Sequence, residues 1–489
     1  MTTQPTFAQT DRAIGAVLGT AAGDALGAGY EFGPALPDDS AVTMKGGGGF
    51  GWAPGEWTDD TSMAVPILRE LAAGADLLDV ATQNRIVAAW AEWARTATDV
   101  GIQTRQVLTG LTAHGGPTAD AARGSARQVH ERSGRSGGNG SLMRTAPVAL
   151  AYLGEGQEQQ LAEAARALSE LTHHEDDAGD ACVLWCLAIR HAILTGETDA
   201  AIGLPWLPGG RRERWAQLIA DAEAKQPRDF PRNGWVVEAL QAAWSAIARG
   251  EGLVDTLERA VRGGGDTDTV AAIAGALAGA ARGASGIPFR WRRMLHGWPG
   301  LRAQQLSDLA ILASRGGRPD SVGWPSAPRV DYAGWGDIRV LVPHPHDPGV
   351  LLGAVGVLDA LPAEVDAVVS LCRLGATQVP ERIPSGVQHR VWLLDTASHV
   401  DNPHLEDVLR DAADAVAELR AEGRVVLLHC VQAQSRTPTV AAMYAARHFG
   451  VDPSTALGEV CAALPNAHPN AAFRDAMSRV ATGGTAARR

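Results

Sequence analysis

Two clusters of aspartate and threonine, far apart in the chain, carry the side chains best suited to chemistry. The first is Glu56-Trp57-Thr58-Asp59-Asp60-Thr61, and the second is Gly263-Gly264-Gly265-Asp266-Thr267-Asp268-Thr269. Each precedes an apolar segment with helical spacing, so both are predicted loop-to-helix junctions. Their carboxylates and hydroxyls are the hard oxygen ligands that Mg²⁺ and Mn²⁺ prefer. Four carboxylates at one place would repel each other unless cations held them, so the sequence predicts a metal site if the junctions meet.

A cysteine followed by a helix-opening arginine forms a second chemical motif. The stretch Val425-Val426-Leu427-Leu428-His429-Cys430 leads from a predicted strand into Val431-Gln432-Ala433-Gln434-Ser435-Arg436-Thr437-Pro438, where a helix begins. Amides and the helix dipole at such a junction stabilise a thiolate and bind phosphate, while the guanidinium clamps two phosphate oxygens. The motif predicts an anion cradle with a nucleophilic thiol. A buried structural cysteine beside a chance arginine is the alternative.

The elements that position the acidic clusters are predicted to be helices. Between about residues 11 and 313 there is no strand-like alternation, whereas apolar residues recur at helical spacing in 85–94, 161–171, 181–192, 234–248 and 269–281. Gly275, Gly279 and Gly283 recur every four residues and predict a central helix with a bare face against a neighbouring backbone. Pro66 predicts a kink in the helix after the first cluster.

The cysteine motif lies in a region with a different texture. A Gly- and Pro-rich stretch near residues 314–336 separates it from the helical part. Predicted strands at 338–342, 365–371, 391–394 and 425–429 alternate with predicted helices at 349–361, 404–421, 438–448 and 471–480, which indicates a mostly parallel sheet with crossover helices. We therefore predict an all-helical domain over residues 1–314, a linker over 315–330 and an α/β domain over 331–489.

Composition limits the possible partners and compartment. The 489 residues carry a net charge of −12 and no basic run longer than two residues, which argues against binding a nucleic-acid backbone. Five cysteines without a CxxC pair fit a reducing compartment. The N-terminus lacks the basic and apolar regions of a signal peptide, and the longest apolar run is too short to span a bilayer. We expect a cytoplasmic protein with no membrane or nucleic-acid partner.

Glycine-rich stretches at residues 14–27, 46–51 and 137–144 combine with the two acidic clusters in an order that resembles the ADP-ribosylglycohydrolase family. The resemblance covers roughly residues 11–312. It implies an all-helical fold with two Mg²⁺ ions, or Mn²⁺, that bind the ribose of an ADP-ribosyl group and assist cleavage of its N- or O-glycosidic bond. The implied partner is an ADP-ribosylated protein or small-molecule conjugate.

This resemblance also implies roles for individual residues. It assigns metal binding to Thr58, Asp59, Asp60, Asp266, Asp268 and Thr269, catalysis to Glu31, Asp59 and Asp60, and substrate binding to Gly137, Gly138, Asn139, Gly140, Ser141 and His173. Asp24, which precedes a glycine-containing stretch, is interpreted as a capping or turn residue. Cys182 and Cys186 are one helical turn apart and are interpreted as core, with a zinc site shared with His173 and His174 as the alternative.

The His-Cys-x5-Arg-Thr arrangement resembles the cysteine-dependent dual-specificity and tyrosine phosphatases over about residues 330–485. It implies that Cys430 is the nucleophile, that Arg436 binds phosphate, that Thr437 assists the thiolate as leaving group and that Asp395, or alternatively Asp401, is the general acid. The phosphate would be lined by Gln432, Ala433, Gln434 and Ser435. Ala433 stands where glycine is usual, so a left-handed backbone there would cost about 1 kcal/mol or more.

Together, the two motifs predict one hydrolase with two modules. The first would be a Mg-dependent glycohydrolase acting on ADP-ribosyl bonds, and the second a phosphatase-like module acting on a phosphorylated substrate. A protein that binds ADP-ribose or phosphate without turnover is the alternative.

Overall fold

The chain forms two compact units. The computed structural model describes residues 4–336 and 338–482. The first unit contains the chain up to Ile287 together with Met294–Arg318, and the second contains Pro288–Arg293 together with the chain from Pro319 onward. The short segment Pro288–Arg293 thus packs within the second unit, whereas the predicted boundary places it in the helical domain.

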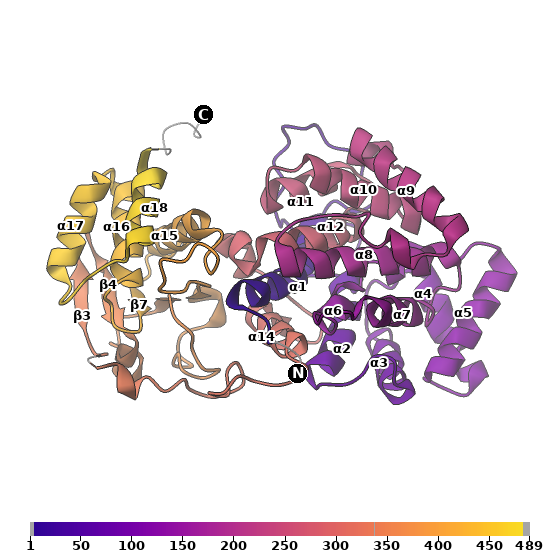
Figure 1. The fold of residues 1–489 in the computed structure, drawn as a ribbon, viewed down its shortest axis with the longest axis horizontal. Helices are drawn as coiled ribbons and strands as arrows, with labels where there is room; N and C mark the ends of the chain where they lie inside the picture. Colours follow the sequence, from indigo (N-terminus) through magenta and orange to yellow (C-terminus); the bar gives the residue numbers. More distant parts are fainter. Residues whose placement is uncertain (1–3, 337, 483–489) are drawn as a thin grey trace. The chain divides into compact units, whose positions relative to one another are not determined.

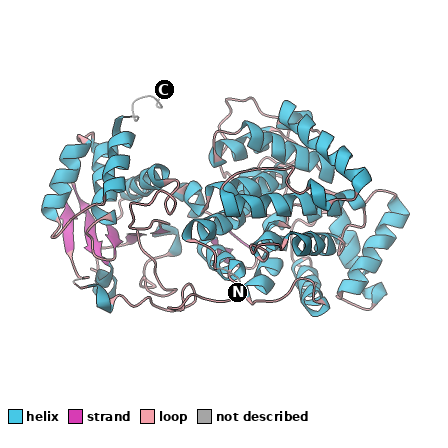
Figure 2. Cartoon of the chain, in the orientation of Figure 1, coloured by secondary structure: helices cyan, strands magenta, loops and turns pink. Residues whose placement is uncertain are grey.

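Helices build the first unit (Figures 1 and 2). They are α1 (Phe7–Gly27), α2 (Asp59–Ala72), α3 (Val80–Trp93), α4 (Ile102–Gly110), α5 (Ala119–Ser133), α6 (Ala146–Leu150), α7 (Glu158–Ser169), α8 (Asp176–Thr195), α9 (Gly209–Ala224), α10 (Val236–Arg249), α11 (Leu253–Arg262), α12 (Thr267–Arg282) and α14 (Ala303–Ser314). The predicted helical segments correspond to α3, α7, α8, α10 and α12. A two-residue antiparallel ladder, β1 (His296–Gly297) with β2 (Leu301–Arg302), departs from the all-α prediction. Helix α2 continues through Pro66 without interruption.

Glycines bring α1 and α12 into backbone contact. A Cβ atom added at Gly19 would lie 2.1 Å from the carbonyl oxygen of Gly275, and one added at Gly15 would lie 2.2 Å from that of Gly279. Further along α1, a Cβ at Gly27 would lie 2.4 Å from the Cα of Asp268. The predicted bare helix face is therefore confirmed, and its partner is α1. This approach places the C-terminal end of α1 directly against the N-terminal end of α12.

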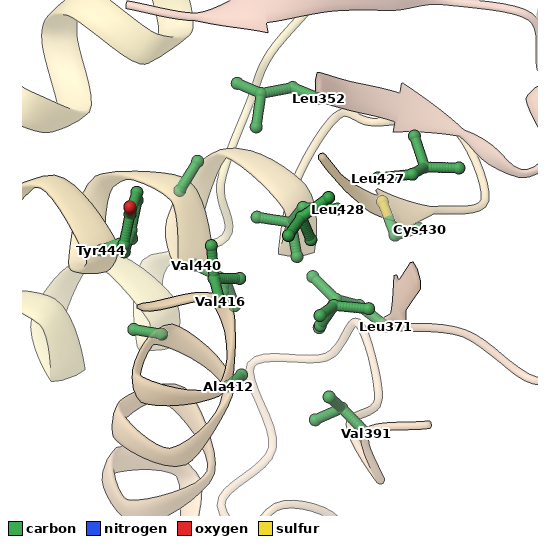
Figure 3. Close-up of a cluster of buried hydrophobic side chains, with 14 of the residues drawn as sticks. Leu352, Leu371, Val391, Ala412, Val416, Leu427, Leu428, Cys430, Val440 and Tyr444 are labelled. Carbon is green, nitrogen blue, oxygen red and sulfur yellow. The ribbon is translucent and has the colours of Figure 1, made fainter. Parts of the chain in front are cut away.

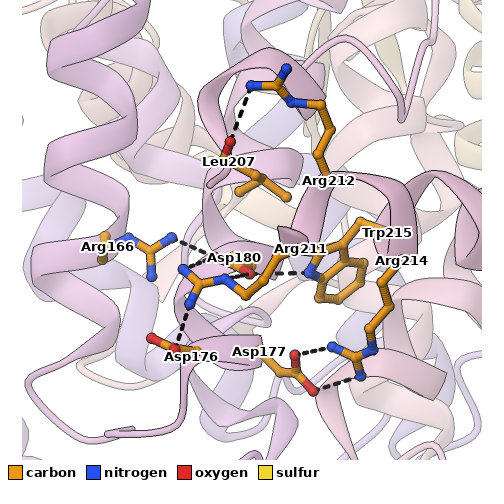
Figure 4. Close-up of polar contacts among 9 residues, drawn as sticks. All are labelled: Arg166, Asp176, Asp177, Asp180, Leu207, Arg211, Arg212, Arg214 and Trp215. Carbon is orange, nitrogen blue, oxygen red and sulfur yellow. Dashed lines mark hydrogen bonds and ion pairs between the residues drawn. The ribbon is translucent and has the colours of Figure 1, made fainter. Parts of the chain in front are cut away.

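Helix α8 is a core helix tied to its neighbours by a buried carboxylate. It is long and apolar enough to cross a bilayer, yet 83% of its most apolar stretch is buried inside the unit. Asp180 of α8 is fully buried and accepts hydrogen bonds from Arg166 (2.5 Å), Arg211 Nη2 (3.1 Å) and Trp215 (3.2 Å) (Figure 4). Because Arg211 and Trp215 lie on α9 and Arg166 on α7, Asp180 fastens three helices together.

A five-stranded sheet forms the centre of the second unit. Its strands are β3 (Leu341–His344), β4 (Asp347–Ala354), β5 (Ala367–Ser370), β6 (Gln388–Arg390) and β7 (Val426–Cys430), and its helices are α13 (Phe289–Arg292), α15 (Leu405–Ala421), α16 (Arg436–Phe449), α17 (Pro453–Ala463) and α18 (Ala471–Thr482). The strand order is β3-β4-β7-β5-β6. All neighbours are parallel except β3, which pairs antiparallel with β4. The predicted mostly parallel sheet is therefore confirmed.

Two predicted elements of this unit are wrong. Residues 349–361, predicted as a helix, form most of β4 followed by a 3₁₀ segment, Val355–Ala360. A short apolar run of this kind cannot be assigned by periodicity alone, because β4 is hydrogen-bonded on both sides and its apolar residues are buried. Residues 391–394, predicted as a strand, follow β6 without strand pairing.

The core of the second unit lies between this sheet and its helices. Figure 3 shows Leu428 of β7, Val416 of α15 and Val440 of α16 among the buried side chains of one cluster. Phe289, 2% exposed, belongs to the same cluster, and its N–H donates to the Asp411 carboxylate at 2.8 Å. Strand β7 therefore sits in the middle of the sheet on a packed core, and its last residue is Cys430.

Candidate active sites

Asp24 organises the acidic end of the first unit from within α1. Its carboxylate accepts bonds from the Thr58 N–H (2.7 Å) and hydroxyl (2.8 Å), and from the Thr61 N–H (2.9 Å) and hydroxyl (2.6 Å). The interpretation of Asp24 as a turn residue is wrong, because the residue lies inside the helix and is fully buried. It does cap a helix, but that helix is α2, whose own N-cap Thr58 makes no side-chain cap.

The two acidic junctions meet at this point. Three sets of acidic side chains each offer ligand atoms lying within 4.8 Å of one another: Asp24, Asp60 and Asp268; Glu31, Asp266 and Asp268; Asp59, Asp99 and Asp268. The Thr58 hydroxyl lies 3.2 Å from Asp60 Oδ2 and 3.3 Å from Asp268 Oδ2. The Thr269 hydroxyl lies 3.4 Å from Asp60 Oδ2. The structure thus brings together all six side chains to which the sequence assigned metal binding.

Glu31 reaches this cluster from the segment that follows α1, residues 28–33, which we call the strap and which is anchored beside the cluster. The Phe32 N–H donates to the Gly265 carbonyl at 2.7 Å, and the Gly265 N–H donates to the Gly33 carbonyl at 2.9 Å. These bonds fix the strap to the loop that leads into Asp266. Phe32 itself has a φ of 59° and is 72% exposed, so the backbone is strained where the strap turns.

The electrostatics of the cluster favour bound cations. Burial and neighbouring carboxylates raise the pKa of Asp60 and Asp268 well above the ordinary value, and burial raises the pKa of Glu31 to about 9. Among residues 4–336 and 338–482, Asp60 Oδ1 and Glu31 Oε2 are buried and find no hydrogen-bond partner. Carboxylates that repel each other and leave oxygens unpaired fit a site for divalent cations, because a cation would satisfy both.

Asp99 joins the cluster although no local pattern marks it in the sequence. It lies in the loop before α4, and burial together with the Asp266 charge raises its pKa to about 6. Asn139 also contacts the cluster, since its Nδ2 donates to Asp266 Oδ2 at 2.7 Å. The opposite side of Asp266 is held by Asn233, whose Oδ1 accepts the Asp266 N–H at 3.0 Å.

The glycine-rich turn of residues 137–141 lies between Asp266 and His173. A Cβ added at Gly138 would lie 3.4 Å from His173 Nε2, and one at Gly140 would lie 3.3 Å from His173 Cε1. At Gly137 an added Cβ would instead meet the Glu175 carboxylate at 2.7 Å. The turn therefore presents backbone rather than side chains to the His173 ring.

Ser141 points into the core rather than toward the turn. Its hydroxyl lies 2.9 Å from the Ser169 hydroxyl and 3.5 Å from Cys182 Sγ. Cys182 and Cys186 are fully buried on α8, as expected for core residues. Within the described residues, the acidic and sulfur groups close enough to hold a metal include neither cysteine, so the zinc alternative has no support.

The second unit places Cys430 and Arg436 at the two ends of one loop. Cys430 ends β7, and Arg436 is the first residue of α16. Arg436 Nη1 donates to the carbonyls of Leu371 (2.7 Å) and Leu393 (3.3 Å). Within the loop, Ala433 is 1% exposed and has a φ of 57°. The left-handed backbone considered from the sequence is therefore present, on a residue that carries a Cβ.

Asp395 lies beside this loop. Its Oδ1 accepts bonds from the Ser435 hydroxyl (2.7 Å) and from Asn470 Nδ2 (3.1 Å), and its Oδ2 is 3.7 Å from Arg436 Nε. Asp401, the alternative, lies in a following turn with its N–H bonded to the Ser398 carbonyl. Asn470 was not identified from the sequence, since nothing local links it to the cysteine motif.

Other residues of the loop between Cys430 and α16 anchor it to neighbouring segments or lie buried inside it. Gln432 Nε2 donates to the Trp335 carbonyl at 2.5 Å, and the Gln434 carbonyl accepts the His468 N–H at 2.6 Å. The Thr437 hydroxyl is buried and has no hydrogen-bond partner in the part of the chain that the structure describes. These contacts pin the loop at both flanks of Ala433.

The first unit is built from helices, and its buried carboxylates gather where α2 and α12 begin, as in a metal-binding hydrolase. Comparison with known proteins gives its family. The model of the ADP-ribosylglycohydrolase family matches residues 4–320, so the chain belongs to that family. The chain is 34% identical over 292 residues to an ADP-ribosylarginine hydrolase Tri1 of Pseudomonas putida (strain GB-1), covering 58% of this chain and 73% of that protein.

Two further relatives agree. The chain is 33% identical over 293 residues to an ADP-ribosyl-[dinitrogen reductase] glycohydrolase of Rhodospirillum rubrum, covering 58% of this chain and 89% of the other. A solved structure described as an ADP-ribosylglycohydrolase-related protein complex is 32% identical, covers 63% of this chain and 99% of its own, and has a TM-score of 0.51. The predicted family of the first unit is confirmed.

Proposed function

We propose that the first unit hydrolyses an N-glycosidic bond between ADP-ribose and an arginine side chain, using bound divalent cations. The observation that carries this proposal is the meeting of the two Asp/Thr junctions in one buried, unsatisfied acidic cluster. One relative, at 34% identity, is named an ADP-ribosylarginine hydrolase, and another, at 33% identity, is named a glycohydrolase of ADP-ribosyl-dinitrogen reductase.

The residues present would hold Mg²⁺ or Mn²⁺ through Thr58, Asp59, Asp60, Asp266, Asp268 and Thr269. Bound cations would supply a water of lowered pKa and fix the ribose hydroxyls. Glu31 offers a carboxylate oxygen within 4.8 Å of those of Asp266 and Asp268, and bound cations would lower its raised pKa, so that it can take a proton from an attacking water. Asn139 and Asn233 hold Asp266 in place for this task.

Asp99 is the side chain best suited to the leaving group. Its carboxylate lies within 4.8 Å of those of Asp59 and Asp268, at the loop before α4. A carboxylate also accepts the paired N–H groups of a guanidinium. We therefore assign Asp99 to binding the arginine guanidinium.

The test is release of ADP-ribose from an ADP-ribosylarginine peptide and from an ADP-ribosylserine peptide, with and without chelator. We expect release from the arginine peptide, loss of activity in chelator and recovery with Mg²⁺. Asp268→Asn should lower the rate at least a hundredfold, whereas Asp120→Asn, an exposed carboxylate of α5, should not change it. Full activity in chelator would refute the metal assignment, and preference for the serine peptide would refute the linkage.

A second activity is proposed for the Cys430 loop on its own geometry. A thiol at a strand end, an arginine at the following helix start and a carboxylate within 3.7 Å of that arginine form the parts of a phosphate-ester hydrolase. Cys430 would attack phosphorus, Arg436 would bind the phosphoryl oxygens and Asp395 would protonate the leaving oxygen. Phosphate release from a nitrophenyl phosphate, compared between the wild type and Cys430→Ser, tests this. Equal release by both would refute the role of Cys430.

The substrate class of this second site is proposed to be a compact phosphate. Gln432 and Gln434 on the rim are neutral, and the protein is acidic, so the loop lacks a basic collar for polyanions. A phosphorylated ADP-ribosyl or nucleotide metabolite would suit a neighbour that releases ADP-ribose. Faster release from phosphotyrosine peptides than from ADP-ribose phosphate esters would contradict this assignment.

A further inference from the structure

A buried arginine lies behind His173 and makes no ion pair among the described residues. Arg144 is 1% exposed, and its guanidinium carbon sits 4.1 Å from the centre of the Trp90 ring. Its Nη2 donates to the Thr172 hydroxyl at 2.6 Å and to the Leu168 carbonyl at 3.4 Å. A guanidinium only donates, so the short contact uses a lone pair of the Thr172 oxygen.

The Thr172 hydroxyl connects Arg144 to His173 by hydrogen bonds. Its oxygen is 2.8 Å from His173 Nδ1, and no other acceptor for the hydroxyl proton is present in the described part of the chain. The proton must therefore point to Nδ1, which makes Nδ1 the acceptor. A neutral imidazole that accepts at Nδ1 carries its own proton on Nε2.

The other ring nitrogen faces the glycine turn. His173 is 1% exposed, and in the described part of the chain its Nε2 has no hydrogen-bond partner. This nitrogen is nevertheless not completely buried. The backbone at Gly138 and Gly140 approaches this nitrogen, so that a Cβ added at Gly138 would lie 3.4 Å from it and one added at Gly140 would lie 3.5 Å from it. Burial and the charge of Arg144 lower the pKa of His173 well below its ordinary value.

We infer that Arg144 and Thr172 hold His173 as its Nε2–H tautomer, making this nitrogen a fixed donor to an acceptor atom of the ligand over the Gly138–Gly140 turn. The ligand part rests on the proposed function, whereas the tautomer does not. The same turn carries Asn139, which bonds Asp266, so a ligand spanning from the acidic cluster across the turn would meet Nε2–H. Arg144 and Thr172 are thus positioning residues, since they act through His173.

The tautomer is measurable on the full chain without substrate. Long-range proton–nitrogen spectra of histidine-labelled protein show which ring nitrogen is protonated, and the His173 signals are those missing in His173→Gln. We expect the Nε2–H form from pH 6 to pH 8, and a mixture of tautomers in Thr172→Val, which keeps the shape but removes the hydroxyl. A charged ring, or a proton on Nδ1, in the wild type would overturn the inference.

The donor role has its own measurement, binding of ADP-ribose followed by calorimetry. A glutamine amide can replace an Nε2–H donor, so His173→Gln should bind within about threefold of the wild type. His173→Leu should bind about tenfold or more weakly, as expected for loss of a hydrogen bond of about 1.4 kcal/mol. The exposed neighbour variant His174→Gln serves as the control and should bind as the wild type does. Equal affinities for the leucine and glutamine variants would overturn the donor role, even if the tautomer is as expected.

Discussion

Replacing Ala433 by glycine should be nearly free of cost, although the methyl group is buried. An alanine at a φ of 57° is strained by about 1–2 kcal/mol relative to glycine, so the change removes that strain. Against this, the glycine variant loses about 0.8 kcal/mol of methyl burial and about 0.4–1 kcal/mol through the larger entropy of its unfolded chain. The sum is within about 1 kcal/mol of zero.

Ala442→Gly is the matched control, because Ala442 is equally buried but lies inside helix α16. Its cost is about 1 kcal/mol of helix propensity plus about 0.8 kcal/mol of methyl burial. The two variants should therefore differ by roughly 2 kcal/mol.

The assay is denaturant-dependent hydrogen exchange of peptides from β7 and α16, which reports the second unit separately from the first. If Ala433→Gly destabilises this unit as much as Ala442→Gly does, then the left-handed backbone at Ala433 stores no strain and the reasoning fails.

Three further changes test other parts of the fold. Gly19→Ala should destabilise the first unit by about 3 kcal/mol or more, because its methyl group would overlap the Gly275 carbonyl. The control Gly210→Ala, at an exposed position of α9, should be neutral or stabilising. Denaturant midpoints compare the two variants, and similarly small effects would contradict the close packing of α1 and α12. Asp180→Asn should cost about 1–3 kcal/mol, since Arg166 would lose its ion pair and the partly exposed Arg211 would keep only Asp176, and an unchanged midpoint would mean that the network contributes nothing. Burial lowers the pKa of His389 to about 4, so the unfolded chain binds a proton below about pH 6.5 that the folded chain does not bind. The free energy of unfolding is therefore full above about pH 6.5 and falls by up to roughly 3 kcal/mol toward pH 4. His389→Gln should reduce this pH dependence, which unfolding measurements at about pH 7 and about pH 4.5 check.

The sequence revealed the parts of the sites that are written in short stretches of chain. Asp59-Asp60 and Asp266-Thr267-Asp268 are local clusters at helix starts, and Cys430 and Arg436 flank one loop, so residue type and spacing suffice to find them. Asp99 could not be found in this way, because it enters the cluster through tertiary contact and its neighbours in the chain carry no pattern.

The same distinction explains the errors in secondary structure. Helices with one apolar face, such as α10 and α15, were predicted to within a few residues. Strand β4 was not, because it is hydrogen-bonded on both sides and its continuous apolar run reads equally well as a buried helix. The helix that Asp24 caps could not be predicted for a related reason: its role depends on Thr58 and Thr61, which only the fold brings to it.

The glycine spacing that joins α1 to α12 has a consequence for how the acidic cluster is assembled. Because the glycines of both helices recur every four residues, sliding α1 by one turn would again set glycine against glycine, so close packing alone permits more than one register. Such a slide would carry Asp24 about 6 Å along the axis and separate it from Thr58 and Thr61. The four hydrogen bonds of the buried Asp24 carboxylate therefore determine the register of α1 against α12, which the helix surfaces alone do not determine. As a result, the helix pair docks and the acidic cluster forms in a single event.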